Sequence, residues 1–201
     1  MSITSYRRDL RAIARGYWMG LWNDAQFNDL MFSAIDRGLE AAWFEGAKKV
    51  GILPDEITPT EQVALATIVF KEYAMVPGLA TFIFQNNRDR SKLAGKNLHT
   101  VYSKIINRIE LWVNRYKDVV NRAKVESGKD PKLKWVLGPT KNHCSTCGKL
   151  SGKVKRASWW RDNVMPQQPP NDALECKGWK CGCNLEPTDE PVSKGRMPNV
   201  P

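Results

Sequence analysis

Five cysteines confined to one short segment constrain this chain more than any other feature. All of them lie between Cys144 and Cys183, and the first 143 residues contain none. Cysteines that serve as buried hydrophobic residues are scattered along a chain, so this clustering indicates a shared role. The N-terminus lacks the apolar stretch of a signal peptide, so we expect a cytosolic protein. A reducing cytosol favours metal binding over disulfide formation.

The spacing of the cysteines is typical of a zinc site. Cys144 and Cys147 form a C-x2-C knuckle, in which both sulfurs converge on one point and the following Gly148 permits a positive φ. Cys176 and Cys181, with Gly178 between them, resemble a second, looser knuckle. Two such pairs close a tetrahedral Zn²⁺ site, and the metal would supply folding free energy to a segment that has few aliphatic residues.

Five cysteines and an adjacent His143 exceed the four positions of such a site. If Cys181 and Cys183 lie on extended backbone, their side chains point to opposite faces, and only one can bind the metal. The first choice of ligands is therefore the set Cys144, Cys147, Cys176 and Cys181, with Cys183 as the first reserve and His143 as the second. Reduced cysteines in a turn-rich segment, or a disulfide in a protein that matures outside the cytosol, remain as alternatives.

The histidines indicate that this zinc is structural. A catalytic zinc keeps an open coordination position and needs a general base nearby. The chain has only His99 and His143, in neither an H-x-E nor an H-E-x-x-H motif. We expect a closed site and no enzymatic activity.

The net charge of +10 is concentrated in the middle of the chain. Residues 91–156 carry sixteen Lys and Arg against four Asp and Glu, whereas the flanking parts are nearly neutral. Such a block suits nucleic acid or an acidic protein surface, although a solvated basic helix face would give the same pattern. The candidate DNA-binding residues all lie on one predicted helix: Lys104, Arg108, Arg115, Lys117, Arg122 and Lys124.

Apolar periodicity predicts a mainly α-helical fold. The longest expected helix covers about 97–126, and its apolar stripe is Val101, Ile105, Ile109, Trp112, Tyr116, Val119 and Ala123. Earlier helices are expected at 5–21, from Asn23-Asp24 onward and from Thr58, where Glu61 completes a capping box. No run of eighteen apolar residues is present, so no membrane-spanning segment is expected.

After Pro131 the pattern changes to a small cysteine-rich module. Short strands are expected at 134–137, at Val154 and at 158–160, and Trp135, Trp159 and Trp160 are expected to form the core. Trp179 is the exception: it lies between Lys177 and Lys180 and could stack on a base. The expected domains are a helical body at 1–127, a zinc-binding module at 128–186 and an extended tail at 187–201.

The cysteine segment resembles the Mu F-like phage head morphogenesis proteins, also called minor head or minor capsid proteins. The resemblance rests on Gly128-Lys129, Lys134-Trp135, the stretch from Cys144 to Gly152, the loop from Pro166 to Pro170, Cys176, and Cys181-Gly-Cys183-Asn-Leu185. The pattern from Ala41 to Gly51 is similar to the helical part of the family. Two positions depart from the pattern: Gly182 replaces an Arg, and Cys176 stands where His is frequent.

The resemblance implies a low-copy structural virion protein, added near the portal during capsid assembly and present in the host cytoplasm until then. Its implied partners are the portal, the major capsid protein and packaged DNA, without a membrane. Two alternatives are a zinc-containing regulatory protein that binds nucleic acid and a nuclease with a structural zinc. The first lacks a recognition helix between its cysteine pairs, and the second lacks a nuclease motif.

Overall fold

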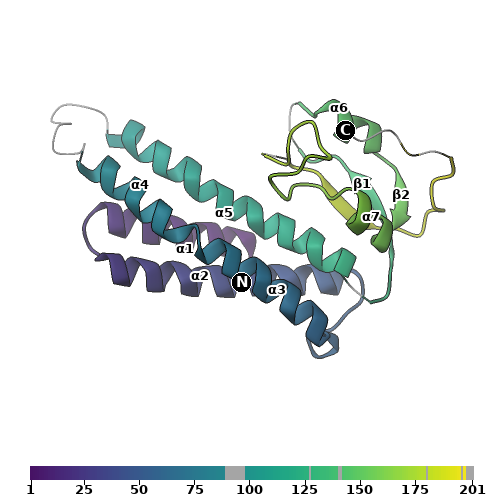
Figure 1. The fold of residues 1–201 in the computed structure, drawn as a ribbon, viewed down its shortest axis with the longest axis horizontal. Helices are drawn as coiled ribbons and strands as arrows, with labels where there is room; N and C mark the ends of the chain where they lie inside the picture. Colours follow the sequence, from purple (N-terminus) through teal and green to yellow (C-terminus); the bar gives the residue numbers. More distant parts are fainter. Residues whose placement is uncertain (89–97, 127, 140–141, 180, 196, 198–201) are drawn as a thin grey trace. The chain divides into compact units, whose positions relative to one another are not determined.

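The computed structural model is mainly helical and carries a small sheet near its C-terminus (Figure 1). It describes residues 1–88, 98–126, 128–139, 142–179, 181–195 and 197. The helices are α1 (Ile3–Trp18), α2 (Asp24–Lys49), the 3-10 turn η1 (Pro54–Glu56), α3 (Pro59–Tyr73), α4 (Val76–Arg88), α5 (Leu98–Glu126), α6 (Ser145–Leu150) and α7 (Ala157–Asn163). The strands are β1 (Lys132–Val136), β2 (Val154–Arg156) and β3 (Asn184–Pro187).

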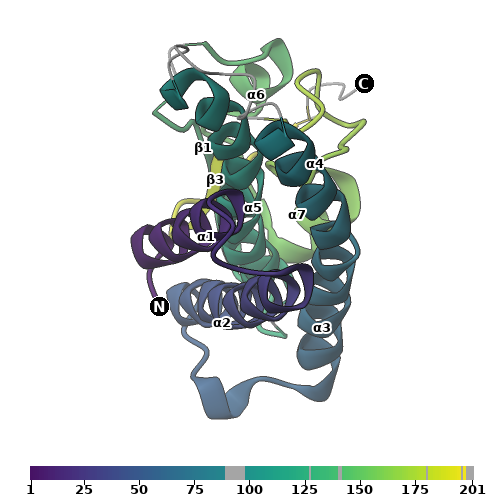
Figure 2. The ribbon, with the colours of Figure 1, turned by 90° about the vertical axis from the view of Figure 1, so that its left-hand side faces the viewer.

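The chain divides into two compact units. The first unit comprises Met1–Ala42 and Val63–Tyr116, and the second comprises Trp43–Gln62 and Lys117–Pro201. The first is a helical bundle (Figure 2), and the second contains the sheet and all five cysteines. The expected domains are each one continuous segment, with a boundary between residues 127 and 128, whereas each compact unit combines two separate segments.

Side chains at the helix starts explain where the early helices begin. Asn23 and Gln26 exchange hydrogen bonds with each other's backbone N–H at 2.9 and 3.0 Å, so Asn23 caps α2. The hydroxyl of Thr58 accepts from the N–H of Glu61 at 3.3 Å, and the Glu61 carboxylate accepts from the N–H of Thr58 at 3.0 Å. This reciprocal pair is the predicted capping box.

The apolar stripe of α5 is buried, as the sequence predicts. Ile105, Ile109, Trp112 and Tyr116 all lie in the core of the first unit, while the side chain of Val101 lies outside the described part. The rings of Tyr116 and Tyr6 of α1 are 5.8 Å apart. Glu110 of α5 forms ion pairs with Arg7 and Arg11 of α1. The stripe therefore packs within the chain.

Helices α3 and α4 carry an exposed apolar surface. Val63, Phe70, Met75 and Phe84 are 66%, 74%, 62% and 45% exposed. The stretch Pro59–Asn86 is nevertheless long and apolar enough to cross a membrane by length and composition. A turn at Ala74 and Met75 separates the two helices. This finding is weak evidence for a membrane span, because helices of soluble proteins pass the same test.

The sheet of the second unit has the strand order β2-β1-β3, and both pairs are antiparallel. Its packed side presents Leu133, Trp135 and Leu185, which form one core cluster with Trp160 of α7, and all four are fully buried. Strand β3 was not predicted. The segment expected as a strand at 158–160 lies in α7 instead, because the Asp130 carboxylate accepts from the N–H of Ser158 at 2.7 Å and caps that helix.

Backbone groups at both edges of this sheet have partners. On β3, Asn121 accepts from the N–H of Leu185 at 3.1 Å, and Lys124 donates to the Leu185 carbonyl. Two α5 side chains, one turn apart, thus take the place of a further strand. On β2, the N–H of Val154 donates to the Ser193 hydroxyl, and the Val154 carbonyl accepts from the N–H of Ser193. The tail therefore lies along the sheet, and both edges are protected from further strand pairing.

Lys124 gives this arrangement a pH dependence. Burial lowers the pKa of Lys124 to about 8, although Glu186 opposes that shift. Between pH 7 and 10 the folded state loses this proton before the unfolded state does, so stability rises with pH. We expect wild type to gain about 2–3 kcal/mol of unfolding free energy over this range relative to Lys124→Met.

Urea unfolding of the two proteins at pH 7 and pH 10, followed by tryptophan fluorescence, measures this difference. Lys48→Met is the matched control, because Lys48 is exposed. If the unfolding free energies of wild type and Lys124→Met change equally with pH, the pKa of the buried Lys124 is not lowered.

Candidate metal centre

The first cysteine pair sits at the start of α6. Cys144 is the N-cap residue of this helix, and its sulfur accepts from the N–H of Cys147 at 3.4 Å. The N-cap position and the third helical residue lie on the same side of the first turn, which brings both sulfurs together. Gly148 lies inside α6 and has no positive φ, so the prediction that it supplies one is wrong.

The second group of cysteines lies on a tight loop before β3. Lys177 and Gly178 have φ values of 52° and 76°, and the N–H of Cys181 donates to the Gly178 carbonyl at 3.3 Å. A Cβ atom on Gly138 would lie 2.0 Å from the carbonyl oxygen of Gly182. Glycine at position 138 is therefore required for the segment after β1 to approach the Cys181-Gly182-Cys183 segment.

These two segments bring all five sulfurs into one cluster. Cys144, Cys147 and Cys176 form one group, and Cys147, Cys181 and Cys183 form another, with the sulfurs of each group within 4.8 Å of one another. The sulfurs of Cys147 and Cys181 are 4.0 Å apart. Tetrahedral Zn–S bonds of about 2.3 Å would place two ligand sulfurs about 3.8 Å apart, so the spacing is compatible with a shared metal ion.

The position of Cys183 differs from the expectation. The sequence suggested that Cys181 and Cys183 point to opposite faces, but their sulfurs lie in the same group. The reason is that β3 begins only at Asn184, so the two cysteines precede the regular alternation of the strand. Cys183 is 1% exposed and faces the core with Cys147. It is therefore as well placed to bind metal as Cys181.

Hydrogen bonds between the thiols of the cluster shift their pKa values in opposite directions. Hydrogen bonds with Cys181 and Cys183 raise the pKa of Cys147, whereas hydrogen bonds from Cys147 and Cys181 lower the pKa of Cys183 to about 3. Burial raises the pKa of Cys176 to about 11. Thiolates are the metal-binding form, so a metal ion entering the cluster displaces the remaining protons.

Glu175 joins the two cysteine-bearing loops. One of its carboxylate oxygens accepts from the N–H of Ser145 at 2.8 Å and from the Ser145 hydroxyl at 2.7 Å. Its own N–H donates to the Thr146 hydroxyl at 3.3 Å. The bonds from Ser145 lower the pKa of Glu175. These three hydrogen bonds are called the Glu175 clamp below. Because Ser145 follows Cys144 and Glu175 precedes Cys176, the clamp holds the sulfurs of Cys144 and Cys176 near each other.

Removal of the clamp is expected to weaken metal binding. Glu175→Ala should lower the affinity about tenfold or more, as is typical for residues that orient metal ligands. Glu175→Gln keeps an acceptor for the N–H of Ser145 and should lose less. Competition with a chelator of known affinity measures the difference, and Asp172→Ala, on the exposed part of the same loop, is the control. Equal affinities for Glu175→Ala and Asp172→Ala would exclude the clamp.

The tryptophans behave largely as the sequence predicts. Trp135 and Trp160 are fully buried in the core of the second unit, with ring centroids 5.5 Å apart, and Trp159 packs edge-on against Trp160. Trp179 is 50% exposed. Lys180 and the side chain of His99 lie outside the described residues, and neither thiol group includes the exposed His143.

The predicted DNA-binding residues are not equivalent in the structure. Lys104 is exposed and Lys117 partly so, while Arg108 is exposed and lies 3.9 Å above the Phe82 ring. Arg115 pairs with Glu72, and Arg122 pairs with Glu126, each at 2.7 Å. Lys124 is buried under β3, so its prediction as a DNA-contacting residue is wrong. The helical pattern alone predicts an exposed Lys124, because the Leu185 carbonyl that it binds lies 61 residues further along the chain.

Comparison with protein-family models, curated proteins and solved structures finds no match for this chain. The site must therefore be interpreted from its own chemistry. Sequence reasoning missed the roles of Glu175, Ser145 and Gly138. Glu175 and Ser145 could have been suspected from their positions beside two cysteines, whereas nothing near Gly138 in the sequence signals its contact with Gly182.

Proposed function

We propose that this chain is a non-enzymatic minor head protein of a phage, which takes part in capsid assembly near the portal and carries one structural zinc ion. The observation that carries the proposal is the cluster of five sulfurs beside the core of a small sheet. Cysteines at these spacings, in a segment that follows a long helix, are the residues on which the resemblance to the Mu F-like head proteins rests.

The donor set supports zinc and a structural role. Thiolates are soft ligands that select zinc over the hard cations calcium and magnesium. Neither thiol group contains a histidine or a carboxylate among the described residues. A site filled by four thiolates has no open position for substrate or water, and two cluster members, Cys147 and Cys183, are also core residues. Such a metal holds a fold together.

Contact with packaged DNA belongs to the same proposal and is expected to be independent of sequence. On α5, the best candidates are the exposed Lys104 and Arg108 and the partly exposed Lys117. Arg115 and Arg122 already pair with carboxylates. Binding that rests on such charges falls steeply with salt. A regulatory protein that binds nucleic acid is the second candidate, favoured by the half-exposed Trp179 beside the exposed Lys177.

Co-purification tests the assignment. The chain, tagged and expressed during infection by a phage that encodes it, should enter particles with the portal protein at low copy number. It is expected in the virion, and in the host cytoplasm only during assembly. If the chain stays out of capsids and portal complexes but binds one DNA sequence tightly, the regulatory function replaces the structural one.

A further inference from the structure

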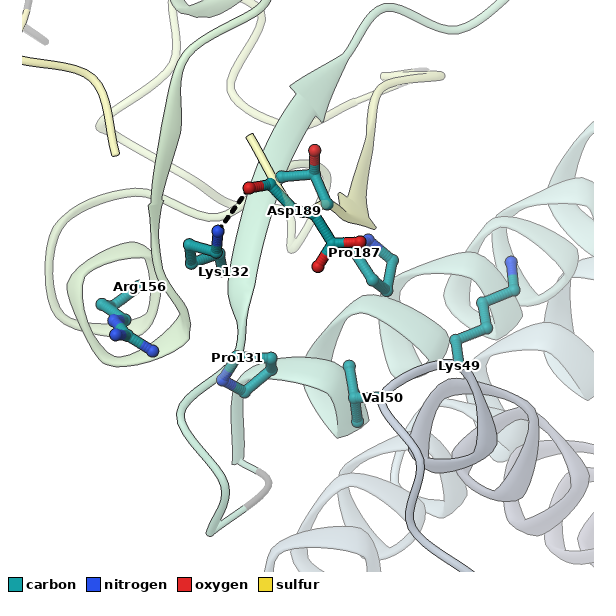
Figure 3. Close-up of a pocket in the computed structure, with 8 residues that line it drawn as sticks. Lys49, Val50, Pro131, Lys132, Arg156, Pro187 and Asp189 are labelled. Carbon is teal, nitrogen blue, oxygen red and sulfur yellow. Dashed lines mark hydrogen bonds between the residues drawn. The ribbon is translucent and has the colours of Figure 1, made fainter. Parts of the chain in front are cut away.

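An open pocket of about 340 Å³, called the cavity below, lies in the second unit between the end of α2 and one end of the sheet (Figure 3). Three cationic side chains line it from three different elements. Lys49 comes from the last turn of α2, Lys132 begins β1, and Arg156 ends β2. None of these residues belongs to the basic face of α5 or to the cysteine cluster, so the cavity is a separate site.

These cations keep donors for a ligand. Lys132 donates to the backbone carbonyls of Asp189 and Glu190 at 2.6 and 3.0 Å, which uses two of its three protons. One nitrogen of Arg156 donates to the Asp130 carbonyl at 3.1 Å, and this bond uses only one of its five N–H groups. Lys49 forms an ion pair with Glu45 of α2 at 3.7 Å, which is longer than a hydrogen bond, and its side chain is 40% exposed. Three cations face a single lining carboxylate, that of Asp189.

The rest of the lining is apolar. Val50, Pro131 and Pro187 form a surface between the cations (Figure 3). A ligand that suits this surface carries a negative charge next to a flat or apolar group. The Asp189 carboxylate disfavours a doubly charged phosphate monoester and tolerates the single charge of a phosphodiester.

We propose that this cavity binds a phosphodiester of a nucleic-acid strand, with a sugar or base against the prolines. The proposal rests on the DNA contact proposed above. It assigns the main phosphate contact to residues of α2, β1 and β2 instead of the basic residues of α5. Each phosphate held in this way releases a condensed counterion, so the site contributes to the salt dependence of binding.

The test is fluorescence anisotropy of a labelled single-stranded decanucleotide with the zinc-loaded full chain at several salt concentrations. Lys49→Gln combined with Arg156→Gln should weaken binding at least tenfold and reduce the slope of log K against log salt by about 0.7 for each phosphate that the variant no longer neutralises. The control, Lys48→Gln combined with Lys194→Gln, removes the same charge at exposed residues outside the cavity and should change both quantities much less. Circular dichroism melts check that both variants fold, and Lys49→Gln alone provides a milder variant.

Four results would overturn the proposal. Equal weakening in the two charge-matched variants would mean diffuse attraction rather than a site. Competition by thymidine monophosphate at the concentration of the oligonucleotide would indicate a free nucleotide as ligand. Preferential binding to phosphatidylglycerol vesicles would indicate a lipid surface, and no binding of any probe would exclude a phosphate site. If the chain enters capsids but the cavity variant binds DNA as tightly as wild type does, only the phosphate site is rejected. Failure of the chain to enter capsids counts against the head-protein function.

Discussion

Replacement of Cys147 by serine is expected to leave the chain without bound metal and to unfold its second compact unit. Cys147 is the one cysteine common to both thiol groups, so its loss removes one sulfur from each group. It is also 2% exposed and part of the core that contains Trp135 and Trp160. Structural zinc contributes on the order of 10 kcal/mol to the folding of small modules, more than most domains have in reserve.

Metal analysis and near-ultraviolet circular dichroism measure the two effects. Wild type should contain about one zinc per chain and lose its tryptophan signal on treatment with a strong chelator. Ser151→Ala, at an exposed position in the same segment, is the control and should behave as wild type. If wild type and Cys147→Ser hold equally little metal, the cluster is not a zinc site. Comparison of Cys183→Ser with Cys176→Ser then identifies the fourth ligand, because the variant that keeps its metal has replaced a sulfur that does not bind it.

Replacement of Trp112 by alanine should destabilise the first unit by about 3–5 kcal/mol. The side chain is 7% exposed and belongs to the buried stripe of α5 between Ile109 and Tyr116. Its indole N–H has no hydrogen-bond partner among the described residues, so the destabilisation comes from packing. For a unit of this size, the melting temperature should fall by at least about 12 °C.

Leu111→Ala is the matched control, since Leu111 is the neighbouring residue on α5 and is 44% exposed. Circular dichroism melts of the three free proteins separate the outcomes. A melting temperature unchanged by Trp112→Ala would contradict packing within the chain and would assign this face to a partner.

The features that the sequence predicted correctly are those encoded by nearby residues. The period of α5 and the Thr58–Glu61 cap need only a few neighbouring residues, and the gathering of the cysteines follows from their spacing. Two errors are local, because Gly148 lies inside α6 and Cys183 precedes the first residue of β3. The larger errors concern contacts between distant segments. Asp130 turns an expected strand into α7 by capping it from 28 residues away, and the burial of Lys124 depends on β3. No local pattern carries that information.

The strand order β2-β1-β3 has a consequence for how this unit folds. Strands β1 and β3 pair although almost fifty residues separate them, and such distant pairing is slow because a long loop must close first. The cysteines lie inside that loop, with Cys144 shortly after β1 and Cys183 immediately before β3. A zinc ion captured by both ends would close the loop beside the two strands before they pair. Zinc supply would then set the rate at which newly made chains fold this unit.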